Sequence, residues 1–463
     1  MSGRGLRRAV PHQGAAGSGT DPRVGLGTLR LDGAVMPIQI ADYLPSDADA
    51  AARAALTANA YAMQGSMILG IAGQVRALLA EGREIANFTV GDFKPAQFRI
   101  PGELSEAIQR AVAEGQTNYP PSDGVPELRE AIAELYRRDL GLDYGPEGVC
   151  VGSGARPPIY TTWSLFVEPG DRTTSFVPMW NVGYYAHLFR SDHRFIPTTA
   201  EANFFPTVEQ CREAVRDSRL VVVNTPLNPT GTAASREVIE GLGRALVEEN
   251  AGRERPCMLL FDQVYWMLTA PGTEHYNPVQ LVPECAPYVV HVDAISKCFA
   301  GTGLRLGWGV LPPYLQRRMK SLVGHVGSWA PRAEQLATAW FLSDPARVSA
   351  YMTQMNADVQ ARLDRLNDGI QAMRSRGLPV NSIAPQGAIY LSLQVDAVGR
   401  KGFPDNAAIL RLLLEEAGVA VVPFQAFDRK EDDGWFRLSV GAVGLDDIDG
   451  ALERTEKALR AHL

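Results

Sequence analysis

The chain has 463 residues, of which 46% are hydrophobic and 21% are charged, as is usual for a globular protein with a large core. Its formal net charge of -7 disfavours non-specific binding to nucleic acid or to a membrane surface, because both favour a basic protein surface. The length allows about two or three domains.

The N-terminal stretch differs in composition from the rest of the chain. It is rich in Gly and Arg and lacks the apolar segment of a secretory signal, so we expect residues 1–35 to form a disordered tail. The composition becomes ordinary at Met36, which is an alternative start for the native protein. Residues 36–97 are predicted to form an N-terminal arm and part of a small domain.

Hydropathy and cysteine usage bear on where the protein works. No run of about 18 apolar residues occurs, so no membrane-spanning helix is expected. The five cysteines include no C-x-x-C pair, and scattered reduced thiols are typical of a cytoplasmic protein. We therefore predict a cytoplasmic location.

Short apolar runs alternate with helical stretches between residues 148 and 311. Several runs are nearly continuous in Val, Leu and Ile, like strands that are buried on both faces. This alternation predicts an α/β fold with an open, mostly parallel seven-stranded sheet flanked by helices. Ligands bind such sheets beyond the carboxyl ends of the strands. The runs are 148–153, 173–178, 194–198, 220–225, 258–261, 289–295 and 307–311.

Two helices are predicted around this core. Residues 126–140 begin with Pro126, which suits a first helical turn, and are followed by Gly141, which suits a helix end. Residues 345–375 carry apolar side chains at helical spacing. Strands at 387–393 and 436–440 then indicate a second, smaller α+β domain. We predict a large domain over 98–344 and a small C-terminal domain over 345–463.

Lys297 lies where an apolar strand ends, and Arg305 follows eight residues later. A lone lysine is usually a solvated surface residue. At the mouth of a buried strand, however, a desolvated amine has a lowered pKa, and the neutral amine is the form that makes an imine with an aldehyde. The guanidinium group of Arg305 suits a phosphate.

Polar residues also end two earlier strands. Asp262 closes an apolar run, and a carboxylate there needs a partner or a function; a pyridinium N–H is a suitable partner. Asn228 and Tyr265 can both donate to a phenolate oxygen. Taken alone, the loop around Asn228 is equally typical of a plain turn.

Three further features complete the set of candidate residues. A strand, a Gly-rich loop and a helix meet around Gly154, Ala155 and Arg156, where backbone N–H groups can hold a phosphate. Trp180 follows the next strand and suits either ring stacking or core packing. Arg437 lies in a strand-like segment, where it pairs with a substrate carboxylate or with an internal acid. No metal site is predicted.

The combination resembles the class I/II aminotransferases, the aspartate aminotransferase family of fold type I enzymes that depend on pyridoxal 5′-phosphate (PLP). The resemblance runs from about residue 67 to the C-terminus. Its most specific segments are NPTG at 228–231, DQVY at 262–265, SK…GLRLGW at 296–308 and FRLSVG at 436–441; the segments 90–95 and 118–132 also resemble the family.

The resemblance implies a role for each candidate residue. Lys297 holds PLP as a Schiff base and moves a proton during catalysis, Asp262 pairs with the pyridine nitrogen, and Asn228 and Tyr265 contact the phenolate oxygen. The remaining roles are phosphate binding by Ser296, Arg305 and the segment Gly154, Ala155 and Arg156; ring stacking by Trp180; substrate carboxylate binding by Arg437, Gly91 and Asn228; and contact of Tyr119 with the partner subunit's phosphate, which implies a homodimer with shared active sites.

The sequence departs from the family pattern at three positions. Ala294 replaces a serine and removes a phosphate hydroxyl, and Gln263 replaces a glutamate. Arg156 stands where some relatives carry a lysine that reads the distal carboxylate of the substrate. An acidic amino donor such as aspartate or glutamate is one reading of Arg156; the other is that it faces the phosphate or solvent.

The resemblance predicts a PLP-dependent aminotransferase that moves an amino group from an amino acid to a 2-oxo acid by a ping-pong mechanism. A PLP-dependent lyase, such as a C–S lyase, or a synthase remains an alternative, because the same residues hold the cofactor in either case. A PLP-binding transcriptional regulator is disfavoured, since the N-terminal stretch is too short and Gly-rich for a helix-turn-helix. A non-catalytic member is disfavoured by the presence of Lys297, Asp262 and Arg437.

Overall fold

The computed structural model describes residues 30–31, 34–35 and 37–463. The chain divides into two units, one that ends at Tyr61 and one that spans Ala62–Leu463. The predicted disordered tail lies outside the described residues, apart from a short antiparallel pairing of β1 (Arg30–Leu31) with β2 (Ala34–Val35). The predicted domain boundaries stay predictions.

The first unit contains short helices. They are η1 (Ile40–Tyr43), α1 (Ala48–Ala55) and α2 (Ala58–Tyr61). The Asp47 carboxylate accepts the Ala50 N–H at 2.9 Å, which satisfies one of the free donors at the start of α1. The Tyr61 hydroxyl donates to Asp49 and accepts from Arg53.

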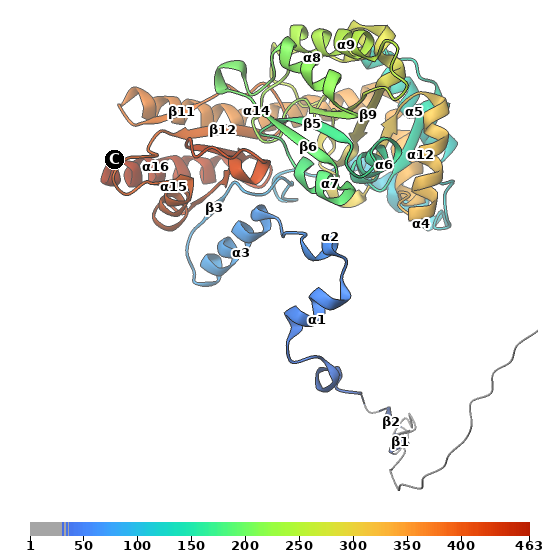
Figure 1. The fold of residues 1–463 in the computed structure, drawn as a ribbon. Coiled ribbons are helices and arrows are strands. Elements are labelled where there is room, and N and C mark those ends of the chain that lie inside the picture. The colour runs from blue at the N-terminus through green and yellow to red at the C-terminus, as the bar shows by residue number, and fades with distance from the viewer. Residues whose placement is uncertain (1–29, 32–33, 36) are drawn as a thin grey trace, which may run out of the picture. The chain divides into compact units, whose positions relative to one another are not determined.

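A seven-stranded sheet forms the centre of the second unit (Figure 1). Its spatial order is β4-β10-β9-β8-β7-β5-β6, and β10 alone in this sheet runs antiparallel to its neighbours. The prediction of a mostly parallel seven-stranded α/β sheet is therefore confirmed. The strands are β4 (Val149–Gly152), β5 (Arg172–Val177), β6 (Asp192–Pro197), β7 (Leu220–Asn224), β8 (Met258–Asp262), β9 (Val289–Ala294) and β10 (Gly307–Val310).

The central strands explain how polar groups reach one edge of this sheet. Every residue of β7, β8 and β9 is buried, as their continuous apolar sequences predict. The parallel strands β7 and β8 pair in register so that Asn224 lies opposite Asp262. Their carboxyl ends therefore bring an amide and a carboxylate together.

Helices pack on both sides of the sheet; in Figure 1, α8 and α9 lie on one side and α6 and α7 on the other. The helices of this part are α4 (Gly102–Ala113), α5 (Pro126–Leu135), α6 (Arg156–Phe166), α7 (Val182–Phe189), α8 (Val208–Asp217), α9 (Arg236–Asn250), α10 (Pro278–Leu281), α11 (Ile295–Cys298), α12 (Pro313–Val326) and α13 (Arg332–Leu342). The helix predicted over 126–140 is α-helical only to Leu135. A π-helical turn continues it to Leu140, and Gly141 ends it with φ +67°.

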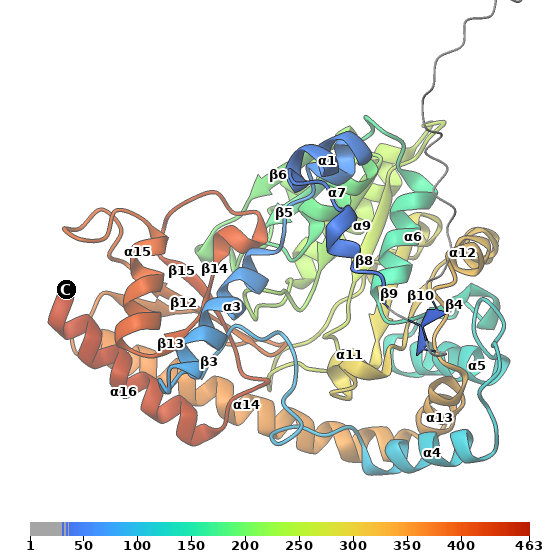
Figure 2. The same ribbon diagram turned by 90° about the horizontal axis from the view of Figure 1, so that it is seen from below.

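A four-stranded sheet, in the order β11-β12-β15-β14, forms the second part of the same unit. The long helix α14 (Pro345–Ser375) has the bounds that the sequence predicts, and it packs against β11. It also packs against α16 and α13 (Figure 2). The strand β3 (Ala86–Asn87) pairs with β13 (Val419–Ala420). The other elements are α3 (Met67–Ala80), β11 (Val380–Ser382), β12 (Tyr390–Val395), α15 (Asn406–Arg411), β14 (Val422–Pro423), η8 (Phe424–Phe427), β15 (Trp435–Ser439) and α16 (Leu445–His462).

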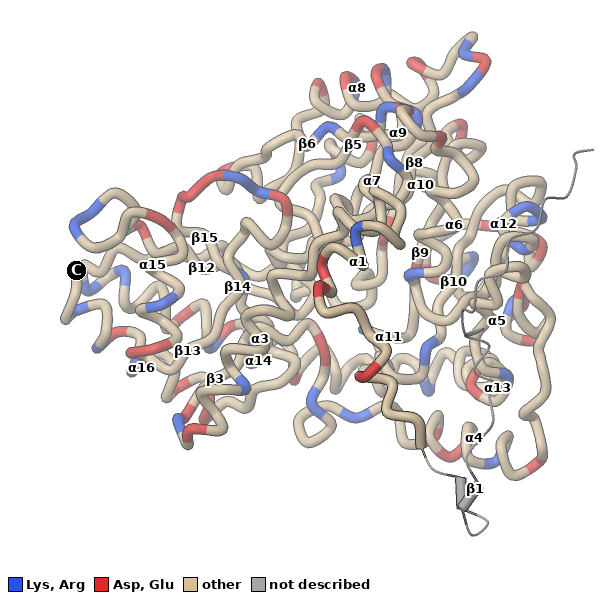
Figure 3. The backbone as a smooth tube through the Cα atoms, turned by 60° about the horizontal axis from the view of Figure 1, so that its bottom comes forward, with Lys and Arg blue, Asp and Glu red and all other residues tan. Residues whose placement is uncertain are grey.

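Acidic and basic residues are mixed along the second unit (Figure 3). Among the described residues, no helix is long and apolar enough to cross a bilayer. An open, mostly parallel sheet of this kind binds its ligands beyond the carboxyl ends of the central strands.

Candidate active site

A cavity of about 480 Å³ opens at the carboxyl ends of β7, β8 and β9. Its lining combines residues that end the strands of the large sheet with residues from the four-stranded sheet and from the segment after β3. They are Ile68, Gly91, Asp92, Ala155, Arg156, Ile159, Trp180, Asn224, Asn228, Asp262, Val264, Tyr265, Ala294, Ser296, Lys297, Thr302, Gly303, Arg305, Tyr390 and Arg437. The structure thus brings together most of the candidate residues.

Lys297 enters the cavity from α11, the single helical turn that follows β9. Its ammonium group donates to the carbonyl oxygen of Gly91 at 2.5 Å. Lys297 also lines the cavity, so its side-chain nitrogen can be reached by a carbonyl group of a ligand there.

Asp262 ends β8 and is the buried acid of this cavity. Its Oδ1 accepts the Val264 N–H at 3.3 Å. Burial, opposed by this hydrogen bond and by the charge of Lys297, raises the pKa of Asp262 to about 7. A buried carboxylate that has no cation in direct contact within residues 37–463 is suited to a cationic ligand group.

The loop after β7 holds Asn228 through its neighbour on the strand. Asn224 Oδ1 accepts the Asn228 backbone N–H at 2.8 Å, and Asn224 Nδ2 donates to the carbonyl oxygen of Asp262 at 3.0 Å. The Asn228 side chain is buried and lines the cavity. Tyr265, in the turn after β8, reaches the same cavity, and its hydroxyl lies 2.8 Å from that of Tyr390.

Arg305 faces the N-terminus of α6. Its guanidinium donates to the carbonyl oxygens of Thr302 (2.6 Å) and Ser153 (2.9 Å) and has no carboxylate partner among the described residues. Gly154 has φ +90°, and a Cβ at this position would collide with the Arg305 guanidinium. Two prolines in the first turn of α6 lack an N–H, so the anion-binding corner consists of Arg305 and the N–H groups of Ala155 and Arg156.

Arg437 is a buried cation without a carboxylate partner in the described part of the chain. Its side chain is 2% exposed, and burial lowers its pKa. Nη1 donates to Asn228 Oδ1 (3.1 Å), Nη2 donates to the carbonyl oxygen of Thr89 (2.6 Å), and Nε has no partner. Since burial of an uncompensated charge is costly, this arrangement suits an anionic ligand.

Arg156 and Trp180 lie together at another wall of the cavity. The Arg156 guanidinium carbon is 4.9 Å from the centre of the Trp180 ring, within the range of a cation–π contact. Among the described residues Arg156 forms no salt bridge, so its charge is available to a ligand.

Two predicted residues do not line the cavity. Gly154 lies behind Arg305, where its lack of a side chain permits close approach of the guanidinium. Tyr119 is 81% exposed and packs edge-on against Trp329 at 5.4 Å. Its predicted contact with a partner subunit stays a prediction.

The sequence reasoning missed several residues of the cavity. Asn224 and Tyr390 are the most informative, since both hold predicted residues in place through hydrogen bonds. Asn224 could have been found from its place at the end of an apolar strand. Tyr390 lies in a predicted strand of the small domain, and nothing local in the sequence connects it with Tyr265.

The residues present fit PLP, the cofactor that the resemblance implies. The corner of Arg305 and α6 would hold its phosphate, and Asp262 would pair with its pyridine nitrogen. Asn228 and Tyr265 would contact its phenolate oxygen, and the amine of Lys297 would react with its aldehyde. Two observations support this fit to PLP: Arg305 has no carboxylate partner among the described residues, and burial raises the pKa of Asp262.

Comparison with known proteins identifies the family. Residues 83–454 match the family model "Aminotransferase class I and II". The aspartate/prephenate aminotransferase of Thermus thermophilus is 31% identical over 411 residues, which cover 87% of this chain and 98% of that protein. An aspartate aminotransferase of Bacillus sp. is 29% identical, with 85% and 96% covered. The structure of Thermus thermophilus aspartate aminotransferase with maleate superimposes with a TM-score of 0.78 at 29% identity, over 87% of this chain and 99% of that one. This chain therefore belongs to the class I and II aminotransferases, an enzyme family that uses pyridoxal 5′-phosphate.

Proposed function

We propose that this aminotransferase moves an amino group from an L-amino acid to a 2-oxo acid by a ping-pong mechanism, with the site residues acting as the sequence predicts. The observation that carries the proposal is the buried, uncompensated charge of Arg437 at the wall of the cavity that also holds Lys297. Both substrates of such a reaction carry the carboxylate that Arg437 would bind.

The chain's own residues would divide the work as follows. Arg437 binds the substrate carboxylate and so orients the substrate Cα in the cavity. PLP, when bound, supplies an electron sink for the negative charge that develops at Cα. Asp262 keeps a proton on the ring nitrogen, and the Lys297 amine takes the proton from Cα.

Arg156 supports an acidic amino donor. It is a cation of the cavity wall without a salt bridge in the described residues, and it lies against Trp180. A second carboxylate on the donor, as in aspartate or glutamate, would give Arg156 a partner. The relatives named as aspartate aminotransferases, one of them solved with maleate, agree with this proposal.

We further propose a cytoplasmic homodimer with shared active sites. All five cysteines are free and buried, which suits a reducing compartment. Tyr119 is an exposed aromatic side chain that packs against Trp329, and aromatic side chains are enriched at subunit contacts.

The test is a spectroscopic half-reaction. Addition of aspartate to the purified PLP-bound protein should convert its visible absorbance to that of the pyridoxamine form, and 2-oxoglutarate should restore it. Release of ammonia with pyruvate from an amino acid, without any oxo acid acceptor, would instead establish the alternative, a PLP-dependent lyase. Absence of both responses with a panel of amino acids would overturn the proposal.

A further inference from the structure

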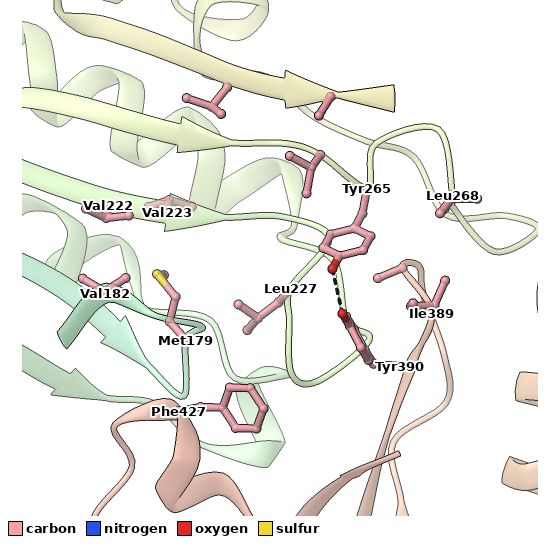
Figure 4. Packing of buried hydrophobic residues seen from close by; sticks show 14 of the residues in the cluster. Met179, Val182, Val222, Val223, Leu227, Tyr265, Leu268, Ile389, Tyr390 and Phe427 are labelled. Carbon is pink, nitrogen blue, oxygen red and sulfur yellow. Dashed lines mark hydrogen bonds between the residues drawn. The ribbon is translucent and has the colours of Figure 1, made fainter. Parts of the chain in front are cut away.

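Tyr390 contacts both Tyr265 and Arg437. It is the first residue of β12, and its hydroxyl lies 2.8 Å from the hydroxyl of Tyr265. Figure 4 shows the two hydroxyl groups directed at each other across the boundary between the two sheets. Both side chains are buried, and both line the cavity.

The ring of Tyr390 also contacts the guanidinium of Arg437. The guanidinium carbon lies 4.8 Å from the centre of the Tyr390 ring and 5.0 Å from that of Phe427. Two aromatic faces therefore stabilise a buried cation that has no carboxylate partner among the described residues. In the antiparallel pair of β12 and β15, Tyr390 lies opposite Ser439, which is two residues beyond Arg437. The side chains of Tyr390 and Arg437 therefore lie on the same face of the sheet.

The backbone of Tyr390 is held against the loop that carries Asn228. A Cβ at Gly231 would collide with the carbonyl oxygen of Tyr390, so glycine is required for this approach. The hydroxyl of Ser392, on the same strand, donates to the carbonyl oxygen of Thr230 at 2.9 Å. These contacts place Tyr390 at a defined position beside the cavity.

Each tyrosine hydroxyl carries a single proton, and this fixes which of Tyr265 and Tyr390 donates in the hydrogen bond between them. Burial, followed by the neighbouring Tyr390, raises the pKa of Tyr265 well above its usual value, so Tyr265 keeps its single proton. If Tyr265 donates that proton to the phenolate oxygen of PLP, it must accept one from Tyr390. A hydroxyl that accepts a hydrogen bond becomes a better donor.

We propose that Tyr390 is a positioning residue for both halves of the site: its hydroxyl orients the proton of Tyr265 toward the cofactor, and its ring holds the guanidinium of Arg437 for the substrate carboxylate. This inference rests on the proposed function, because it requires PLP and an amino acid in the cavity. It assigns separable effects to the hydroxyl and to the ring of one side chain.

Two substitutions separate these effects. Tyr390→Phe keeps the ring and removes the hydroxyl, so Tyr265 becomes a weaker donor to the phenolate oxygen of PLP. Because the phenolate is then less stable, the pKa of the bound cofactor should rise. The midpoint of the pH titration of the PLP absorbance should therefore rise by roughly 0.5 unit, while the KM for the amino acid changes less than about threefold. Tyr390→Leu also removes the ring, and its KM should rise by about tenfold.

A double-substitution cycle tests the connection to Tyr265. Tyr265→Phe should raise the titration midpoint at least as much as Tyr390→Phe, and the variant with both substitutions should show no more than the Tyr265→Phe value. Tyr314→Phe, on an exposed tyrosine outside the cavity, serves as the control and should match the unaltered enzyme. If Tyr390→Leu does not fold, the Tyr390→Phe titration and the double-substitution cycle still test the role of the Tyr390 hydroxyl.

The outcomes are distinct. An unshifted midpoint in Tyr390→Phe, or shifts that add in the double variant, would overturn the role of the hydroxyl, and an unchanged KM in a folded Tyr390→Leu variant would overturn the role of the ring. If the unaltered enzyme shows no PLP absorbance, or does not return to it with a 2-oxo acid, the proposed function itself has failed.

Discussion

Arg437 Nη1 lies 3.1 Å from Asn228 Oδ1, although the two residues are 209 positions apart in the chain. A guanidinium only donates hydrogen bonds, so the Asn228 amide must turn its oxygen toward Arg437 and its Nδ2 group away. That orientation leaves Nδ2 as a donor for the phenolate oxygen of PLP. The contact thus aligns a cofactor residue and a substrate residue with each other.

Substitution of Arg437 should weaken substrate binding. Arg437→Lys keeps the charge but loses the two-pronged contact with a carboxylate, so kcat/KM for the amino acid should fall about 100-fold, mostly through KM. Steady-state kinetics with one donor and one oxo acid measure the change. Arg365→Gln removes an exposed arginine paired with Asp449 and should leave KM unchanged. A normal KM in Arg437→Lys would exclude Arg437 as the carboxylate site.

Loss of the Lys297 amine should stop turnover. Lys297→Ala removes the group that would attach PLP and take the proton from Cα, so transamination should fall by about 10³-fold or more. The absorbance of covalently attached PLP should also disappear. Lys401→Ala, at an exposed lysine, is the matched control. Undiminished turnover by Lys297→Ala would contradict the assignment.

Much of the site could be predicted because its residues follow continuous apolar strands. Asp262 and Lys297 both stand where such a strand ends, and the parallel topology brings those ends together. Local pattern alone was therefore enough to group them. The seven-stranded sheet and the long helix α14 followed from the same periodicities.

The parts that escaped prediction depend on contacts between distant segments. Tyr390 belongs to a strand of the four-stranded sheet, and its partner Tyr265 follows a strand of the other sheet, 125 positions earlier. The lysine–carbonyl contact of Lys297 with Gly91 spans 206 positions. No local periodicity encodes such pairs, since they arise only when segments far apart in the chain pack together.

Arg156 should separate acidic from neutral donors. Arg156→Gln removes an unpaired cation of the cavity wall, so kcat/KM should fall by about 10-fold to 100-fold with aspartate or glutamate. With alanine, which has no distal carboxylate, it should change less than about threefold. Donor series with a fixed oxo acid provide the comparison. An equal loss with every donor, together with weaker PLP binding, would place Arg156 at the phosphate instead.

The cofactor-free protein should lose stability as the pH rises, because two buried acids favour their neutral forms. Burial raises the pKa of Asp262 to about 7 and that of Asp293 to about 8, and Asp293 accepts a hydrogen bond from Trp266 at 2.7 Å. Between the unfolded pKa near 4 and these values, the folded state binds more protons than the unfolded state. The contribution of these two groups to the free energy of unfolding is therefore greatest at low pH, and it is lost as the pH rises through the folded pKa values.

Comparison of an Asp293→Asn variant with the unaltered protein between pH 6.5 and pH 8 isolates this effect. The buried histidines His275 and His291, whose pKa burial lowers to about 3, are neutral in the folded state over this window, and their titration in the unfolded chain is the same for both proteins. Asp293→Asn keeps the shape of the side chain and removes its ionisation. Over this window the variant should lose about 2 kcal/mol less unfolding free energy than the unaltered protein. Urea unfolding at the two pH values measures the difference, and Asp364→Asn, at an exposed position of α14, should behave like the unaltered protein. Equal pH dependence in the Asp293→Asn variant would mean that Asp293 ionises in the folded state as it does in the unfolded chain.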